Sequence, residues 1–273
     1  MTLNRDSIKI VASDLDGTLL APDHLLSANS KQTLKELHAK GYTFIFATGR
    51  HHVDVAGIRE SVGIPAYMIT SNGARVHDEK DELLYSENIP QDMVQSVVDA
   101  LNTDSELFVH MYQDDTWLLN QEDEFLRKFH TETGFTYTLF DASNAPTQGI
   151  AKIFITHPKQ DHEHLVEFED ALREKFGDSL NIAFSTPWCL EVMAKEVSKG
   201  EALKAVAEKL GCGLENCIAF GDGMNDAEML SMAGHGFVME NAHEKVKKAL
   251  PNNTVIGSNA DDAVAEFLKK HLL

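Results

Sequence analysis

Two aspartates, Asp14 and Asp16, are separated by one residue in the stretch DLDGT. The apolar, β-branched run 8–12 just before them predicts a buried strand. In an extended backbone both carboxylates point to the same side of the chain, where they repel each other unless a cation lies close by. Mg²⁺ fits best, because it accepts one or two carboxylates together with substrate phosphate. Seen alone, the stretch could also be an ordinary turn rich in Asp, Gly and Thr.

A second predicted strand, residues 42–47, ends in Thr48 and Gly49. A hydroxyl and a glycine amide at the end of a strand, just before a helix, form a good binding site for oxyanions. The residues that follow add positive potential to this site: Arg50, His51 and His52. The alternative is a Thr-Gly turn followed by a solvated basic cluster.

A later predicted strand, residues 217–220, ends in the sequence GDGMND at 221–226. This segment lacks the GxGxxG spacing of dinucleotide-binding loops. Its two acids and its asparagine instead suit a divalent cation and a phosphate. Shortly before it, Lys199 opens a helix that Ser198 caps. Because a lysine in the first turn opposes the helix dipole, we expect an anionic partner there, unless the lysine is simply exposed.

The composition limits the class of protein. Asp and Glu total 43 against 24 Lys and Arg, a formal net charge of −19, which disfavours nucleic acid and anionic membranes as partners. The three cysteines form no CxxC pair, which favours free thiols in a reducing cytoplasm. The N-terminus lacks the apolar core of a signal peptide, and no apolar run is long enough to span a bilayer. We therefore expect a cytoplasmic protein, monomeric or a weak homodimer.

The order of predicted elements indicates two domains. Strands and helices alternate from residue 8 to 70 and again from 198 onward, which is typical of a doubly wound, parallel α/β sheet of the Rossmann type. Between them lie paired strands and helices, with an expected helix at 122–133, which indicate an inserted α+β domain with an antiparallel sheet. The predicted boundaries are 1–87 and 194–273 for the core and 88–193 for the insert. We expect the insert's histidines, such as His157, His162 and His164, to be solvated rather than metal-binding.

The motifs DLDGT, ATGR, SKG and GDGMND occur in that order at three strand ends and one helix start. The combination resembles the haloacid dehalogenase (HAD) superfamily of aspartate-nucleophile phosphatases and covers the whole chain. The insert resembles the type-B C2 cap of the Cof-type hydrolases. The stretches FATGRHHVDV, YMITSNGARVH and CLEVMA look most similar to bacterial pyridoxal-phosphate phosphatases, which also hydrolyse sugar phosphates.

The resemblance implies a role for each motif residue. Asp14 would be the nucleophile that forms an aspartyl-phosphate, and Asp16 the general acid and base. Phosphate would be held at these positions: Leu15, Thr48, Gly49, Lys199 and Asn225. Mg²⁺ would be bound by Asp14, Asp222 and the backbone carbonyl of Asp16, with support from Asp226. The function implied is a Mg²⁺-dependent phosphomonoesterase that acts on small phosphorylated metabolites.

The core motifs bind only the phosphoryl group, so the cap must distinguish between leaving groups. Candidate substrate contacts are Glu191 in the insert and Asn72 and Gly73 in the turn after another predicted strand, residues 66–70. Glu191 could instead be an ordinary strand residue that faces solvent. A phosphomutase of the same superfamily and a sensor that binds phosphometabolites without turnover remain alternative functions.

Overall fold

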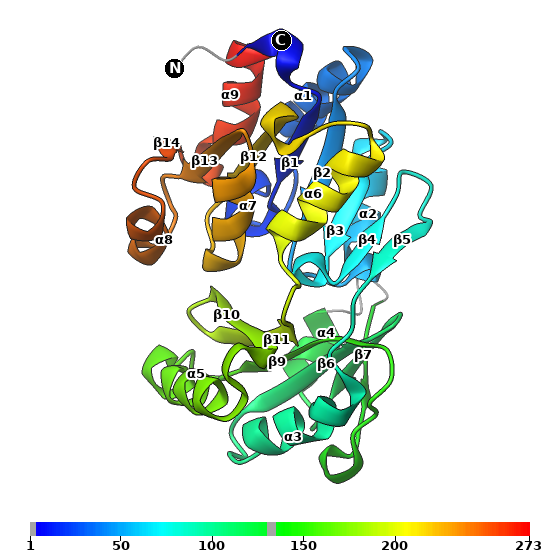
Figure 1. The fold of residues 1–273 in the computed structure, drawn as a ribbon, viewed down its shortest axis with the longest axis vertical. Helices are drawn as coiled ribbons and strands as arrows, with labels where there is room; N and C mark the ends of the chain where they lie inside the picture. Colours follow the sequence, from blue (N-terminus) through cyan, green and yellow to red (C-terminus); the bar gives the residue numbers. More distant parts are fainter. Residues whose placement is uncertain (1–3, 130–134) are drawn as a thin grey trace.

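The computed structural model describes residues 4–129 and 135–273. Figure 1 shows two parts along the long axis of the molecule, each built on its own sheet, with both chain termini in the upper part. The chain enters the lower part after β5 and returns to the upper part after β11. Among the described residues, no helix is long and apolar enough to cross a membrane.

The upper part contains an eight-stranded sheet of order β14-β13-β12-β1-β2-β3-β4-β5. Neighbouring strands from β14 to β3 are parallel, and β4 and β5 add an antiparallel hairpin at one edge. The prediction of a doubly wound parallel α/β core is therefore confirmed. The strand bounds are β1 Ile10–Ser13, β2 Thr43–Ala47, β3 Tyr67–Thr70, β4 Arg75–His77, β5 Leu83–Ser86, β12 Cys217–Gly221, β13 His235–Met239 and β14 Thr254–Ile256.

Helices cover both faces of this sheet because alternate strand residues point to opposite faces. In β1, Val11 packs in one apolar cluster while Ile10 and Ala12 pack in the other. The first cluster includes side chains from α1, α2 and α9, and the second includes side chains from α6, α7 and α8. The helix bounds are α1 Ala28–Ala39, α2 His52–Val62, α6 Lys199–Lys209, α7 Ala227–Met232, α8 Glu244–Ala249 and α9 Ala263–His271.

The lower part is the cap, a six-stranded sheet of order β10-β11-β9-β6-β7-β8. It is antiparallel except for the β7–β8 pair. Helices α3 and α5 pack on one face, and the opposite face is turned toward the core. The bounds are α3 Gln91–Leu101, β6 Phe108–Gln113, β7 Thr116–Leu119, α4 Glu124–Phe129, β8 Tyr137–Leu139, β9 Ile150–Thr156, α5 His162–Phe176, β10 Leu180–Thr186 and β11 Cys189–Ala194.

The structure differs from the sequence-based expectations in several places. The sequence pattern predicts neither the β4–β5 hairpin nor α8. Arg75 and His77 of β4 are polar yet buried, so the pattern of β4 resembles a loop. The expectation that His157 is solvated is wrong: it is buried, and its ring accepts hydrogen bonds from two backbone amides. The last residues of the helix expected at 122–133 lie outside the described part. The domain boundaries stay a prediction, and β11 extends one residue beyond the expected end of the insert.

Candidate active site

Asp14 lies at the carboxyl end of β1, where the chain enters a wide turn. The turn is closed by two hydrogen bonds that each span five residues, from the Leu19 amide to the Asp14 carbonyl and from the Leu20 amide to the Leu15 carbonyl. Gly17 makes it possible, since its φ of 78° lies in the left-handed region that favours glycine. The turn leaves Asp14 at the carboxyl-terminal ends of the parallel strands, where it is only 6% exposed.

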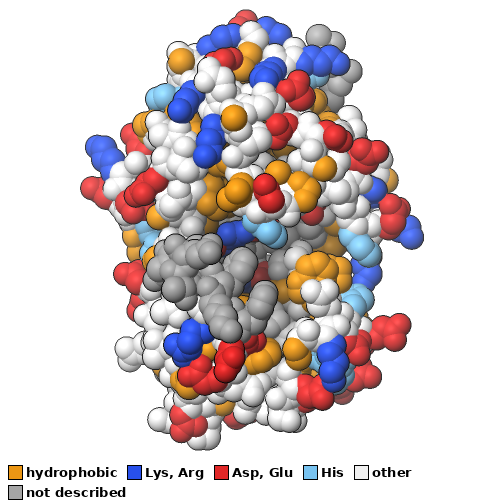
Figure 2. Space-filling model, turned by 180° about the vertical axis from the view of Figure 1, so that it is seen from behind, with side chains coloured by type: hydrophobic (Ala, Val, Ile, Leu, Met, Phe, Trp, Pro, Cys, Tyr) orange, Lys and Arg blue, Asp and Glu red, His pale blue; other side chains and the backbone are white. Residues whose placement is uncertain are grey.

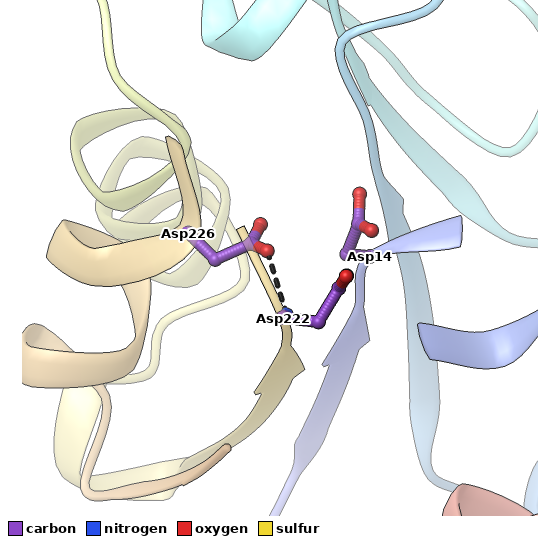
Figure 3. Close-up of side chains that lie close together, drawn as sticks. All are labelled: Asp14, Asp222 and Asp226. Atoms are coloured by element: carbon purple, nitrogen blue, oxygen red, sulfur yellow. Dashed lines mark hydrogen bonds between the residues drawn. The ribbon is translucent and has the colours of Figure 1, made fainter. Parts of the chain in front are cut away.

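Three carboxylates converge at these strand ends, from Asp14, Asp222 and Asp226 (Figure 3). Asp14 follows β1 and Asp222 follows the neighbouring β12, while Asp226 precedes α7. One oxygen from each carboxylate lies within 4.8 Å of the others, a spacing that one cation could bridge. Thr18 donates a 2.9 Å hydrogen bond to Asp222 Oδ1 and thereby fixes the orientation of that carboxylate.

Lys199 lies fully buried in the first turn of α6 and joins two of these acids. Its Nζ is 2.6 Å from Asp14 Oδ1 and 2.7 Å from Asp226 Oδ1. The predicted anionic partner of this lysine is thus confirmed. The backbone amides of Asp222 and Gly223 donate to Asp226 Oδ2, so hydrogen bonds engage both oxygens of Asp226.

The cluster holds more negative charge than one lysine neutralises. Burial raises the pKa of Asp14 well above its ordinary value despite the attraction of Lys199, and neighbouring acids add to the rise. Burial and Asp226 likewise raise the pKa of Asp222 to about 7. A divalent cation would relieve this excess charge, and oxygen donors suit Mg²⁺. Among the described residues, hydrogen bonds engage both oxygens of Asp226 but only Oδ1 of Asp14 and of Asp222, so Asp14 and Asp222 are the better candidate ligands.

Thr48 and Gly49 follow β2, the other neighbour of β1. The Arg50 amide donates to Thr48 Oγ1 at 3.1 Å, so the threonine hydroxyl keeps its own proton for an incoming oxygen. The Asn72 amide donates to the Thr48 carbonyl at 3.0 Å, which holds the loop in place. The structure therefore brings Thr48 to the same sheet edge as the acid cluster. The contact of Thr48 and Gly49 with phosphate stays a prediction.

The Asp16 carboxylate is paired with Arg50 and His24. Arg50 donates two hydrogen bonds of 2.6 Å to its two carboxylate oxygens, and His24 Nδ1 is 2.9 Å from Oδ1. Burial raises the pKa of Asp16, but the hydrogen bonds and charges of Arg50 and His24 together outweigh burial and bring it below its ordinary value. Asp16 is therefore ionised in this arrangement.

Figure 2 shows a hollow between the two parts of the molecule, in which Lys or Arg and His side chains are visible.

The expected basic cluster after Gly49 is reduced to Arg50 alone. Burial and the neighbouring His52 lower the pKa of His51 to about 3, and burial also lowers the pKa of His52. His51 caps α2 by accepting the Val53 amide at Nδ1, and its Nε2 lies 2.8 Å from the Asp114 carbonyl. The two histidines are therefore neutral groups that join core and cap, and the expectation of positive potential from them is wrong.

The residues predicted to contact the leaving group are all buried. Glu191 is 2% exposed, so the alternative in which it faces solvent is excluded. Its carboxylate bonds to Lys152 and to the Asn72 amide group, while Asn72 Oδ1 accepts a 3.0 Å hydrogen bond from Asn225. Gly73 has a structural reason to be glycine: its φ is 106° and a Cβ there would lie 2.2 Å from the Ser198 carbonyl. Substrate contact by these residues stays a prediction.

The sequence also predicts phosphate contacts at Leu15 and Asn225 and a metal contact through the Asp16 carbonyl. Leu15 buries its side chain in the core, so a phosphate contact would have to come from its backbone. The predicted phosphate contact of Asn225 and the metal contact through the Asp16 carbonyl stay predictions.

Sequence reasoning missed the partners of Asp16 and Glu191. Arg50 was noted only as a source of positive potential, and its ion pair with Asp16 spans 34 residues of sequence. His24 reaches Asp16 from a turn where its φ is 62°, and no motif marks it. Lys152 lies in the apolar run of β9, where a lone lysine was the only available signal.

Known proteins resemble this chain over nearly its whole length. A family model described as haloacid dehalogenase-like hydrolase matches residues 11–268. A Haemophilus influenzae protein named putative phosphatase is 45% identical over 262 residues, which are 96% of this chain and 96% of the relative. A Cronobacter sakazakii protein named HMP-PP phosphatase is 37% identical over 260 residues, 95% of this chain and 94% of the relative.

Solved structures agree with this assignment. A haloacid dehalogenase-like hydrolase from B. subtilis is 26% identical with a TM-score of 0.84, covering 97% of this chain and 100% of that chain. One from Bacteroides thetaiotaomicron is 25% identical with a TM-score of 0.81, covering 96% and 99%. The matches extend through both the core and the cap, and the two relatives carry phosphatase names. This chain therefore belongs to the haloacid dehalogenase-like hydrolases and is a phosphatase.

Proposed function

We propose that this phosphatase is a Mg²⁺-dependent phosphomonoesterase that hydrolyses small phosphorylated metabolites through a phosphorylated Asp14. The observation that carries the proposal is the position of Asp14: it contacts Lys199 at 2.6 Å and shares a cation-sized space with Asp222. A buried carboxylate beside a fixed positive charge can attack phosphorus while the developing negative charge is stabilised.

The proposed reaction has two displacements. Asp14 attacks phosphorus, its bond to the phosphoryl group forms, and the bond to the leaving oxygen breaks as Asp16 supplies a proton to that oxygen. Water then attacks the phosphoaspartate, Asp16 takes the proton from the water, and phosphate is released with Asp14 restored. Mg²⁺ bound by Asp14 and Asp222 would neutralise charge on the phosphoryl oxygens. Thr48 and Lys199 hold those oxygens and offset their charge.

Asp16 must carry a proton in the first step and be ionised in the second. The two bonds from Arg50 favour the ionised form, which is the form required to activate water. To protonate the leaving oxygen, the Asp16 carboxyl has to separate from Arg50. Proton donation by Asp16 is therefore coupled to the breaking of its ion pair with Arg50.

A cavity of about 540 Å³ beside Asp222 offers space for the leaving group. Its core side includes Gly223 and Met224, and its cap side includes Phe184 and Trp188. Its lining combines aromatic and apolar side chains with the basic Arg173 and Lys245, which suits a small phosphorylated metabolite with a flat or sugar-like leaving group. We include pyridoxal phosphate and sugar phosphates as substrates on the basis of the sequence motifs, and HMP-PP because relatives carry that name.

Phosphate release from a panel of these compounds, with and without Mg²⁺, tests the proposal. We expect turnover that requires Mg²⁺, and an acid-stable, hydroxylamine-labile phosphoenzyme on Asp14 after rapid quenching. The Asp14→Asn variant should form none. Isomerised substrate without free phosphate would instead identify a phosphomutase, and equal phosphate release by Asp14→Asn would refute the covalent route.

A further inference from the structure

A buried ion pair lies on the face of the cap sheet that is turned toward the core. Lys152 of β9 and Glu191 of β11 are on neighbouring strands, and their Nζ and Oε1 atoms are 2.6 Å apart. Both side chains are 3% exposed. The lysine ammonium also lies 4.9 Å from the ring centre of Tyr112 and 4.5 Å from that of Phe154. This pair is therefore almost completely removed from water.

The pair is bonded directly to one loop predicted to hold phosphate and is linked to the other through Asn72. Lys152 Nζ donates a 2.7 Å hydrogen bond to the Gly49 carbonyl, in the loop after β2. Glu191 accepts from the amide group of Asn72, whose own oxygen accepts from Asn225 at 3.0 Å, in the loop after β12. One charged pair in the cap thus connects to two separate parts of the core site.

The contact with Gly49 fixes a peptide group. Because the peptide between Gly49 and Arg50 is planar, its carbonyl and its amide point in opposite directions. Lys152 holds the carbonyl, and Thr48 Oγ1 accepts from the amide at 3.1 Å. With both ends of this peptide held, the Thr48 hydroxyl proton is left to face an incoming oxygen. A residue of the cap therefore sets the geometry of a phosphate-binding group in the core.

A buried ion pair is a poor device for stability, since an apolar pair of similar volume often serves equally well or better. The charges of Lys152 and Glu191 therefore need another reason to be present. Their contacts supply one, because the Lys152 ammonium donates to the Gly49 carbonyl while the Glu191 carboxylate accepts from Asn72. The arrangement is available only when the cap is seated on the core.

We propose that Lys152 and Glu191 are positioning residues, which complete the phosphoryl-binding loops of the core when the cap docks. The inference builds on the proposed phosphatase reaction, in which Thr48 and Asn225 hold the phosphoryl oxygens. Neither residue contacts the leaving group in this role. A substrate contact by Glu191 would change the ratios of kcat/KM between substrates, whereas positioning lowers kcat/KM by one common factor.

The test compares Lys152→Met with Lys159→Met, a matched control in the cap whose lysine is 70% exposed. For Lys152→Met we expect kcat/KM to fall roughly 10- to 100-fold for every substrate, the effect of a loop displaced by up to about 1 Å. Affinity for inorganic phosphate, measured by calorimetry with Mg²⁺, should weaken as well. The control should match the wild type in both measurements.

The double variant Lys152→Met/Glu191→Gln separates positioning from charge balance. A single substitution leaves one buried charge unpaired and can unfold the protein, whereas the double variant is neutral and its introduced glutamine can still accept from Asn72. We expect the double variant to melt near the wild-type temperature yet to keep the loss of phosphate affinity. Recovery of wild-type phosphate binding and kcat/KM would overturn the inference, as would altered substrate ratios. Because phosphate binding needs no turnover, failure of the proposed reaction would be seen separately.

Discussion

Substitution of Gly17 by alanine tests whether Asp222 must occupy its present position. A Cβ at Gly17 would lie 2.3 Å from Asp222 Oδ2, where ordinary van der Waals contact begins near 3.4 Å. The carboxylate must therefore retreat by roughly 1 Å, a displacement that can cost about 10²-fold in rate when it misplaces a catalytic group. The left-handed φ of 78° adds a loss of stability of about 1–2 kcal/mol.

Gly63→Ala provides a matched control for the backbone strain. Gly63 has a φ of 71° at the end of α2, and no atom lies within 4 Å of a Cβ built there. Both variants should lose similar stability in thermal melts, so a difference in activity would arise from Asp222. We expect Gly17→Ala to need roughly 10- to 100-fold more Mg²⁺ for half-maximal activity, while Gly63→Ala needs the wild-type amount. Equal Mg²⁺ requirements for Gly17→Ala and wild type would refute the assignment of Asp222 as a ligand.

The remaining predictions concern the nucleophile, the metal, the cavity and the buried histidines. Asp14→Asn should lower kcat by about 10⁴-fold or more in initial-rate assays, and retention of a tenth of the activity would contradict its role. EDTA should abolish phosphate release and Mg²⁺ restore it, whereas Ca²⁺ should substitute poorly because its coordination shell is larger and looser. Trp188→Ala should change kcat/KM ratios between pyridoxal phosphate and sugar phosphates by roughly 10-fold, while the exposed Leu83→Ala, outside the residues that line the cavity, should leave them unchanged. Burial, with a further contribution from His52, lowers the pKa of His77 to about 4 from 6.5, so below pH 6.5 the unfolded chain binds a proton that the native chain does not. Native stability should therefore fall as the pH drops from 6.5 toward 4, by up to about 2 kcal/mol at pH 5 from this residue. His77→Phe, which can still stack on His52, should flatten that dependence in melts across this range.

The amino-acid sequence by itself determines where the motif residues converge. Asp14, Thr48 and Asp222 each follow an apolar run, and parallel strands place their carboxyl ends at one sheet edge, so the convergence of these residues follows from pattern and topology. The anionic partner of Lys199 could be expected for a similar local reason, because a lysine in the first turn of a helix requires compensation. These inferences need only short-range periodicity and the geometry of a parallel sheet.

Only the tertiary structure decides how charges pair over long separations. Asp16 pairs with Arg50, and Glu191 pairs with Lys152, through contacts that depend on how turns and the cap are docked. Arg75 and His77 form a buried strand although their polarity resembles a loop, because distant groups take up the hydrogen bonds of Arg75 and the His77 ring stacks on His52. Such partners are close in space but far apart in sequence, so neither periodicity nor motif spacing reveals them. The pairing of Asp16 and the docking of the cap therefore follow from packing, whereas the convergence of Asp14, Thr48 and Asp222 follows from the strand pattern.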